Sequence, residues 1–285
     1  MFPTTSTSRI QRLANHLVNN YLENMVDSLI QVYRRVKYNT FGWFGNYDNW
    51  EAAKSKCSGY DASNILEKIK SSALKVKNGE AAYERDGVLF DKIDHNYPLL
   101  AHLLWIAKNG QISVMDFGGS LGTSYFENKP FLGLLKDAKW SVIEQNDFVT
   151  TGNEEIARDA LKFYYTMDEA IQERGHHDVF LMSGVLPYLE KPYDFLAEVA
   201  SKNFPYIIIN NTYFNPEPAA DRLTVQKVPA YYYEASYPAW FLDYERVKAA
   251  FSDKYELVTE FNNDEFLYFY GKKVIYRGFS LKLKN

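Results

Sequence analysis

Residues 112–122 read Ile-Ser-Val-Met-Asp-Phe-Gly-Gly-Ser-Leu-Gly, and this stretch decides the fold. An apolar run that ends in an acidic residue, followed by three glycines within five positions, predicts a buried parallel strand, a tight turn and the start of a helix. Glycine lets the backbone turn sharply and approach a ligand closely, because a Cβ would clash or forbid the dihedral angles. Such junctions are where α/β proteins bind nucleotide-like ligands.

The spacing of the glycines distinguishes between cofactors. A dinucleotide fingerprint reads G-x-G-x-x-G with an acidic residue about 20 positions later, whereas these glycines are Gly118, Gly119 and Gly122, directly after Asp116. The pattern is closer to the acid-x-G-x-G-x-G loop of class I methyltransferases that use S-adenosylmethionine (SAM), with Ser120 at the middle glycine. A nicotinamide-dependent enzyme is the weaker alternative because its spacing differs.

A second apolar run ends in the same way. Residues 140–144 read Trp-Ser-Val-Ile-Glu, and a doubly wound sheet brings a carboxylate at this place to the ribose hydroxyls of an adenosine. The alternative is that Glu144 is a solvated charge at the end of a strand. Together with the glycine loop, the residue favours an adenosine-containing ligand.

Composition sets wide bounds on the function. A chain of 285 residues holds one large domain, or one domain with a helical cap. The net charge of −4 argues against a nucleic-acid binder that relies on general phosphate attraction. A single cysteine, Cys57, permits no internal disulfide and fits a reducing compartment. We expect a cytoplasmic protein without a membrane span or signal peptide, because no long apolar stretch is present.

The chain divides into two expected parts. Residues 1–110 form a mostly helical N-terminal extension or cap, and residues 111–285 form the SAM-binding domain. Apolar residues at spacings of three and four predict a helix over Arg9–Val36. This helix either packs on its own domain or pairs with a second copy as a homodimer.

After the glycine loop, strand and helix patterns alternate, which predicts a mainly parallel sheet. Two late strands, Tyr255–Phe261 and Phe266–Tyr270, have the pattern of an antiparallel hairpin. The expected fold is therefore α/β, a Rossmann-like sheet of seven strands, mostly parallel with an antiparallel C-terminal hairpin. Residues 211–235 read as a long loop of the kind that covers a site.

Several separated motifs resemble one family, the class I methyltransferases encoded among bacterial capsule and lipopolysaccharide biosynthesis genes. The resemblance runs from about Phe41 to Gly278. Its motifs are Gly-Trp-Phe-Gly-Asn-Tyr at 42–47, Gly-Tyr-Asp at 59–61, Tyr-Glu-Arg-Asp at 83–86, the glycine loop at 116–122, Ile-Glu-Gln at 143–145, Ser-Gly-Val-Leu-Pro-Tyr at 183–188, Val-Gln-Lys-Val-Pro at 225–229 and Ser-Tyr-Pro-Ala-Trp at 236–240. One departure is Asn-Asn-Thr at 210–212, where an Asp-Arg-Thr-like turn is expected.

The resemblance and the residue chemistry imply the same cofactor, SAM, and no metal. Asp116 would organise the glycine turn or hold the ammonium of SAM through water, and Glu144 would bind the ribose hydroxyls. The other expected cofactor contacts come from the ends of the strands: Gly118, Gly119, Ser120 and Gly122 beside the methionine part, Gln145 next to Glu144, Thr166 and Met167 flanking the adenine, and Ser183 and Gly184 near the methionine amino group. For Met167 a place in the core is the alternative.

Methyl transfer to an alcohol benefits from a base within hydrogen-bond reach of the acceptor. His95 is the first candidate base, because it lies in a polar segment beside Tyr97 and a histidine titrates near neutral pH; a surface or capping histidine is the alternative. The expected acceptor contacts come from segments that overhang the strand ends: Arg85, Asp86, Tyr125, Arg222, Gln226, Tyr237 and Trp240.

The sequence thus predicts a SAM-dependent methyltransferase. The resemblance implies O-methylation of a small polar acceptor, a sugar hydroxyl or phosphate-type group on a small-molecule or nucleotide- or sugar-linked substrate, in the biosynthesis of a bacterial surface polysaccharide such as capsule. The alternative is a catalytically weak methyltransferase-like protein that serves as a binding partner or scaffold.

Overall fold

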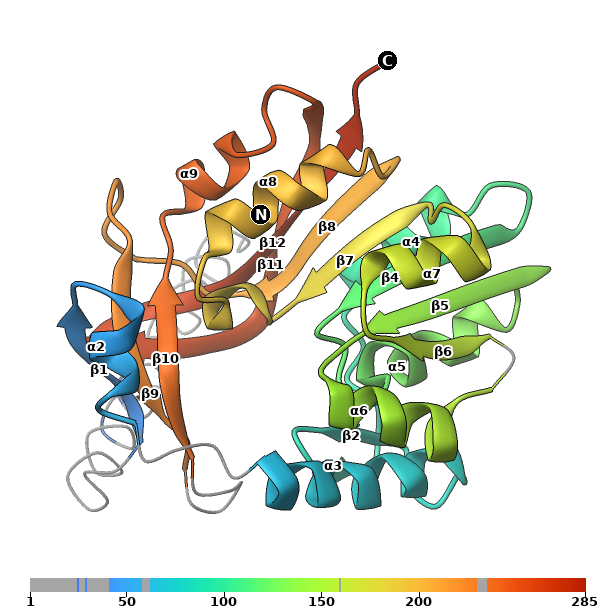
Figure 1. Cartoon of the computed structure of the whole chain (residues 1–285), viewed down its shortest axis with the longest axis horizontal. Coiled ribbons are helices and arrows are strands. Elements are labelled where there is room, and N and C mark those ends of the chain that lie inside the picture. Colours follow the sequence, from blue (N-terminus) through green and yellow to red (C-terminus); the bar gives the residue numbers. More distant parts are fainter. Residues whose placement is uncertain (1–24, 26–28, 30–40, 58–61, 159, 230–234) are drawn as a thin grey trace, which may run out of the picture.

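A computed structural model describes Met25, Leu29 and residues 41–57, 62–158, 160–229 and 235–285 of the chain. A seven-stranded sheet runs through the molecule, and a smaller three-stranded sheet lies beside it (Figure 1). The helix expected over Arg9–Val36 lies outside the described residues except for Met25 and Leu29, which are helical and exposed. Among the described residues, no helix has both the length and the apolar composition to span a membrane.

The large sheet has the order expected of the fold class. From one edge to the other its strands are β11 (Tyr255–Phe269), β12 (Lys272–Leu283), β8 (Tyr206–Thr212), β7 (Val179–Ser183), β4 (Gln111–Phe117), β5 (Asp137–Ile143) and β6 (Leu161–Tyr164). Neighbours from β8 to β6 pair in parallel, and β12 is antiparallel to both β8 and β11. Counted in chain order, the strands lie as 6-7-5-4-1-2-3. The predicted Rossmann-like sheet of seven strands, mostly parallel with an antiparallel C-terminal hairpin, is therefore confirmed.

The two strands predicted for the hairpin, Tyr255–Phe261 and Phe266–Tyr270, are wrong, because both segments belong to the single strand β11 up to Phe269 and the partner strand is β12. The polar residues between the two segments shift the register of β11 and do not form a turn.

The central strands are apolar because both of their faces are covered. Val114, Met115 and residues 179–182 are completely buried in β4 and β7. One face packs against α3 (Ala62–Lys77), α4 (Tyr97–Ile106), α5 (Thr123–Leu132) and α6 (Asn146–Thr151). The other packs against α7 (Met167–Arg174), α8 (Pro192–Ser201) and α9 (Tyr244–Ala249). The sheet is thus the middle of three layers. The carboxyl ends of its parallel strands lie along the same side of the sheet.

The smaller sheet was not predicted. It consists of β1 (Gly42–Tyr47), β9 (Arg222–Lys227) and β10 (Ser236–Phe241), all antiparallel, in the order β1-β9-β10. The sequence predicted an aromatic loop for the first strand and a long loop for the second. Strands of this kind are stabilised by partners far away in the chain, so the local pattern does not show them.

A further two-stranded hairpin lies in the N-terminal extension. Strands β2 (Tyr83–Arg85) and β3 (Val88–Phe90) pair antiparallel. Because β1 also belongs to this part of the chain, the extension expected to be mostly helical contains three strands as well. Since β1 pairs with β9, the segments 1–110 and 111–285 share a sheet.

Candidate active site

The glycine turn follows β4 at the centre of the large sheet. Gly118 has φ of +71°, and a Cβ there would lie 2.4 Å from Cγ2 of Val185. At Gly119 a Cβ would lie 2.5 Å from Oδ2 of Asp116. Ser120 takes φ of +54°, so the serine adopts a left-handed conformation at the middle position of the loop. The glycine turn, residues 118–122, is called the cradle below. It packs so tightly against Val185 and Asp116 that side chains at positions 118 and 119 would overlap them.

Glu144 is fixed against this turn. Its Oε1 accepts a hydrogen bond from the backbone N–H of Ser120 at 3.1 Å, and its Oε2 accepts one from the N–H of Gln145 at 2.8 Å. The carboxyl group is half-buried, and burial raises its pKa while the two N–H donors oppose that shift. Each oxygen keeps a lone pair for a further donor. The group can therefore accept hydrogen bonds from hydroxyl groups beside the cradle.

Asp116 shapes the turn from below. The residue is completely buried, and its Oδ2 accepts a hydrogen bond from Nε1–H of Trp140 at 3.0 Å. Among the described residues its Oδ1 has no hydrogen-bond partner, and burial raises the pKa of the carboxyl group to about 7. Of the two expected roles, this position favours organising the turn, because the side chain packs directly beneath Gly119.

The end of β7 forms the adjacent wall. Ser183 Oγ accepts a hydrogen bond from Nδ2 of Asn210 at 3.0 Å, and Gly184, with φ of +72°, donates its N–H to the Asn210 carbonyl at 3.0 Å. Oδ1 of Asn210 accepts from Nδ2 of Asn96, the N-cap of α4, at 2.9 Å. Asn210 thus connects β7, β8 and the start of α4. From the sequence, Asn210 was noted only as part of a departure from the family motif.

The turn expected to flank the adenine has structural roles of its own. Thr166 caps α7 in a capping box with Glu169. Met167 is buried in the hydrophobic core. The expected adenine contact of these two residues remains a prediction.

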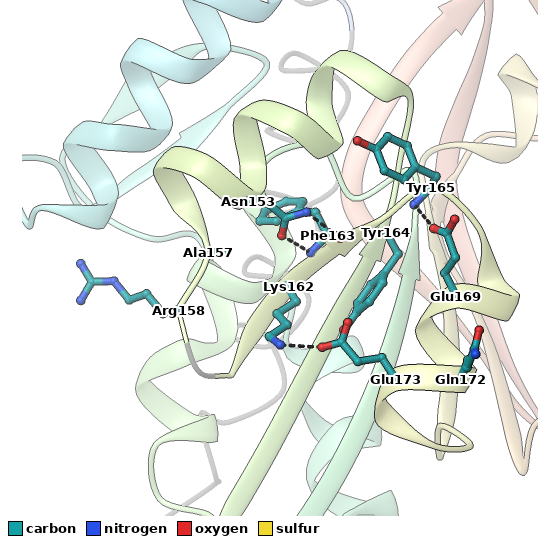
Figure 2. Close-up of a pocket in the computed structure, with 10 residues that line it drawn as sticks. All are labelled: Asn153, Ala157, Arg158, Lys162, Phe163, Tyr164, Tyr165, Glu169, Gln172 and Glu173. Carbon is teal, nitrogen blue, oxygen red and sulfur yellow. Dashed lines mark hydrogen bonds and ion pairs between the residues drawn. The ribbon is translucent and has the colours of Figure 1, made fainter.

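A hollow of about 890 Å³ lies beyond β6, at the outer edge of the large sheet (Figure 2). Asn153 covers this edge by pairing its amide with both the N–H and the carbonyl of Phe163, and Glu169 accepts the N–H of Tyr165. The glycine turn is two strands away, roughly 10 Å at the usual strand spacing. The hollow is therefore separate from the cradle, and its lining satisfies an exposed strand edge.

Two of the expected acceptor residues come together on the small sheet. Gln226 and Tyr237 are cross-strand neighbours in β9 and β10. Tyr188, in the short helix η2 (Leu186–Tyr188), donates its hydroxyl to Oε1 of Gln226 at 2.9 Å, and its ring lies edge-on to Tyr237 at 5.3 Å between centroids. This contact joins the end of β7 to the small sheet. Tyr188 belongs to the motif at 183–188 that carries the family resemblance, but no role was predicted for it.

Three other expected acceptor residues lie away from this pair. Trp240 packs with Ala53, and its place in β10 puts it on the opposite face from Tyr237, an odd number of residues away. Tyr125 is buried against Trp140 in the core. Arg222 stacks its guanidinium 4.3 Å from the ring centroid of Tyr270.

The remaining two expected acceptor residues, Arg85 and Asp86, lie in the β2–β3 hairpin. Arg85 forms an ion pair with Glu265 of β11, and Asp86 lies at the tip of the hairpin. Among the ion pairs of the described residues, none joins Arg85 to Asp86.

His95 does not reach the glycine turn. Its ring packs edge-on against Phe131 at 5.1 Å between centroids. Phe131 is nine residues beyond Gly122, roughly 13 Å along α5 at the usual rise. The structure therefore gives no support to His95 as the base.

Comparisons with known proteins complete the description. No protein-family model matches the sequence, and no curated protein matches it. Solved structures with a similar course include the N-terminal domain of EvdMO1 in the presence of SAH and D-fucose, at 14% identity over 79% of this chain and 98% of that chain with a TM-score of 0.47. A SAM dependent methyltransferase from Aquifex aeolicus has 16% identity over 79% and 100% of the two chains, with a TM-score of 0.44. The PH0226 protein from Pyrococcus horikoshii OT3 has 13% identity over 67% and 89%, with a TM-score of 0.47. At values this low the likenesses carry no weight, and the fold assignment rests on the strand order of this chain.

Proposed function

We propose that this protein is a SAM-dependent methyltransferase whose cofactor binds at the glycine turn. The observation that carries the proposal is the pair formed by the turn and Glu144. A glycine turn with no room for side chains at positions 118 and 119 lies beside a carboxylate already oriented by Ser120 N–H. It stands at the carboxyl ends of the central strands β4 and β5, where open α/β sheets bind ligands.

The residues fit the chemistry of this cofactor. A bound SAM supplies an electrophilic methyl group on a sulfonium. Glu144 would accept hydrogen bonds from the two ribose hydroxyls, and Gly118 and Gly119 would let the backbone approach the methionine part. Ser183 and Gly184 would bound the amino-acid end. In-line displacement depends mainly on alignment, so a rigid turn and fixed walls supply much of the acceleration.

For the acceptor we propose an oxygen of a small polar molecule, a sugar hydroxyl or phosphate-type group. The support is the cluster of polar side chains formed by Tyr188, Gln226 and Tyr237, which follows the end of β7. The role in surface polysaccharide biosynthesis is proposed from the sequence resemblance alone.

A ligand titration tests the cofactor without knowledge of the acceptor. SAM, S-adenosylhomocysteine (SAH) and NAD are titrated into wild type, Glu144→Ala and Glu198→Ala, with thermal shift and calorimetry as readouts. Glu198 is an exposed acid on α8 and serves as the matched control. We expect SAM and SAH alone to raise the melting temperature by mass action.

Loss of hydrogen bonds to a charged acceptor should weaken SAH binding to Glu144→Ala by about tenfold or more, and Glu198→Ala should bind like wild type. Absence of binding by either sulfur ligand would contradict the proposal and favour the scaffold alternative. Binding of NAD alone would favour a nicotinamide-dependent enzyme.

A further inference from the structure

Ser183 lies beside the first glycine of the turn. Phe117 pairs with Met182 near the ends of β4 and β7, so the next residues, Gly118 and Ser183, are neighbours about 5 Å apart, one strand spacing. On its other side Ser183 pairs with Asn210 of β8. Because Ser183 is only partly buried, its side chain is accessible to a ligand that lies along the glycine turn.

The direction of the hydrogen bonds that lead to Ser183 is fixed by a backbone group. Oδ1 of Asn96 accepts the N–H of Leu99 at 3.1 Å, and a backbone N–H can only donate. The other end of this amide, Nδ2 of Asn96, then donates to Oδ1 of Asn210 at 2.9 Å. The Asn210 amide is oriented in turn, and its Nδ2 donates to Oγ of Ser183 at 3.0 Å. In this bond the serine hydroxyl therefore has to act as the acceptor.

Asn210 is held firmly in this orientation. The residue is buried, and its Oδ1 accepts a second hydrogen bond, from Nδ2 of Asn263 at 3.3 Å. Its backbone carbonyl accepts the N–H of Gly184 and the hydroxyl of Thr212. A flip of the amide would turn its NH₂ group toward two donors and leave a buried group unsatisfied, which is costly.

The hydroxyl hydrogen of Ser183 is left for another partner. A serine hydroxyl has one hydrogen and two lone pairs, and Asn210 already occupies a lone pair. Within the ranges of the chain that the structure describes, no protein group accepts this hydrogen. The amino-acid end of SAM carries a carboxylate, which accepts hydrogen bonds only, and an ammonium group, which donates only. Of these two, the carboxylate is the one that a donating hydroxyl can bind.

We infer that Asn210 is a positioning residue, which turns the Ser183 hydroxyl toward the carboxylate of the bound cofactor. This inference rests on the proposed function. Ser183 makes the contact with the ligand, and Asn210 acts through it by occupying the lone pair on the other side. A hydrogen bond from a hydroxyl to a carboxylate is of the stronger, charge-assisted kind, so its orientation matters for affinity.

Two ligands separate this contact from the rest of the site. SAH carries the amino-acid end, and 5′-methylthioadenosine carries the adenosine and the sulfur without it. Both are titrated by calorimetry into wild type, Ser183→Ala, Asn210→Leu and the double variant. Leucine keeps the branched shape of asparagine without its amide.

Asn153→Leu is the matched control. Asn153 also uses its amide to join two segments, but at the far edge of the large sheet, where it bonds the backbone of Phe163. This variant therefore loses amide hydrogen bonds away from the cradle. Should Asn210→Leu fail to fold, Asn210→Thr takes its place, because threonine suits a strand and is too short to replace the amide.

Ser183→Ala should weaken SAH binding by about tenfold, as expected for the loss of a hydrogen bond to a charged group. Asn210→Leu should weaken it by about threefold or more, because the hydroxyl is no longer held in one direction. The double variant should bind SAH as Ser183→Ala does, since Asn210 acts through Ser183. Binding of 5′-methylthioadenosine should stay unchanged in all variants, and Asn153→Leu should bind both ligands like wild type.

Three results would overturn the inference while leaving the cofactor site intact. The first is wild-type affinity for SAH in Ser183→Ala. The second is equal weakening of both ligands, which would show that Asn210 only supports the fold. The third is a double variant that binds SAH more weakly than Ser183→Ala, which would show that Asn210 acts by another route. Failure of both ligands to bind wild type would overturn the proposed function as well.

Discussion

At the scale of single residues, two glycines with similar backbone angles differ in their surroundings. Gly118 and Gly79 have φ of +71° and +79°. A Cβ at Gly118 would lie 2.4 Å from Val185, whereas a Cβ at Gly79 has nothing within 4 Å. The pair therefore separates the cost of the left-handed backbone from the cost of steric overlap with Val185.

We predict that Gly79→Ala lowers the free energy of unfolding by about 1 kcal/mol, the backbone cost alone. Gly118→Ala should lower it by about 2–4 kcal/mol, because steric overlap is added, and should abolish SAH binding. Urea denaturation and calorimetry measure both effects. Equal losses of stability in the two variants would show that Val185 moves aside without cost.

Asp116 makes stability depend on pH. Burial raises its native pKa to about 7 from an ordinary value near 4. The native state then holds a proton that the unfolded state has lost, so the contribution is fully present below about pH 4 and is lost as the pH rises through about 7. The carboxyl group of Glu84, with a pKa raised to about 7, acts in the same direction.

We predict that the free energy of unfolding of wild type, relative to that of Asp116→Asn, falls by about 2 kcal/mol between pH 5 and pH 7. Urea midpoints of the two proteins across this range measure the change. The exposed Asp91→Asn variant controls for the loss of one carboxyl group. A constant difference for Asp116→Asn would mean that Asp116 is already ionised in the native protein.

At the scale of elements, the contact between Thr123 and Glu84 joins the hairpin to α5. We predict that Thr123→Val lowers the free energy of unfolding by about 1–3 kcal/mol, because the buried Glu84 loses a hydrogen-bond donor. Thr150→Val on the exposed part of α6 removes a hydroxyl that bonds the Asn146 carbonyl of its own helix, and should change stability by less than about 0.5 kcal/mol. Chemical denaturation compares the two, and similar losses would show that the hairpin is held by other contacts.

The elements also differ in how far the sequence foretold them. β4, the glycine turn and Glu144 were predictable, because a buried strand and a tight turn leave their pattern within a dozen residues. β1 and β9 were not, because each acquires its strand conformation from a partner far away in the chain. His95 was placed near the reaction by sequence proximity, whereas its ring packs against a later turn of α5. Asp86 was expected to contact the acceptor, and only the pairing of β2 with β3 shows that it lies in a hairpin turn.

At the scale of the whole molecule, both the small sheet and the hairpin contact segments that follow the carboxyl ends of the large sheet's strands. The large sheet brings the ends of β4, β5 and β7 together, Tyr188 reaches Gln226 of the small sheet, and Glu84 connects the hairpin to Thr123. The segment before β4 therefore contacts the start of α5 and the small sheet, besides supplying helices that cover the core. The edge hollow beyond β6 lies outside this arrangement.

The most direct measurement of the central claim is a crystal structure of the protein grown with SAH. The account predicts the ligand beside residues 118–122, with its ribose hydroxyls within hydrogen-bond distance of the Glu144 carboxylate. Clear density for SAH in the hollow beyond β6, with the glycine turn free of ligand, would contradict it.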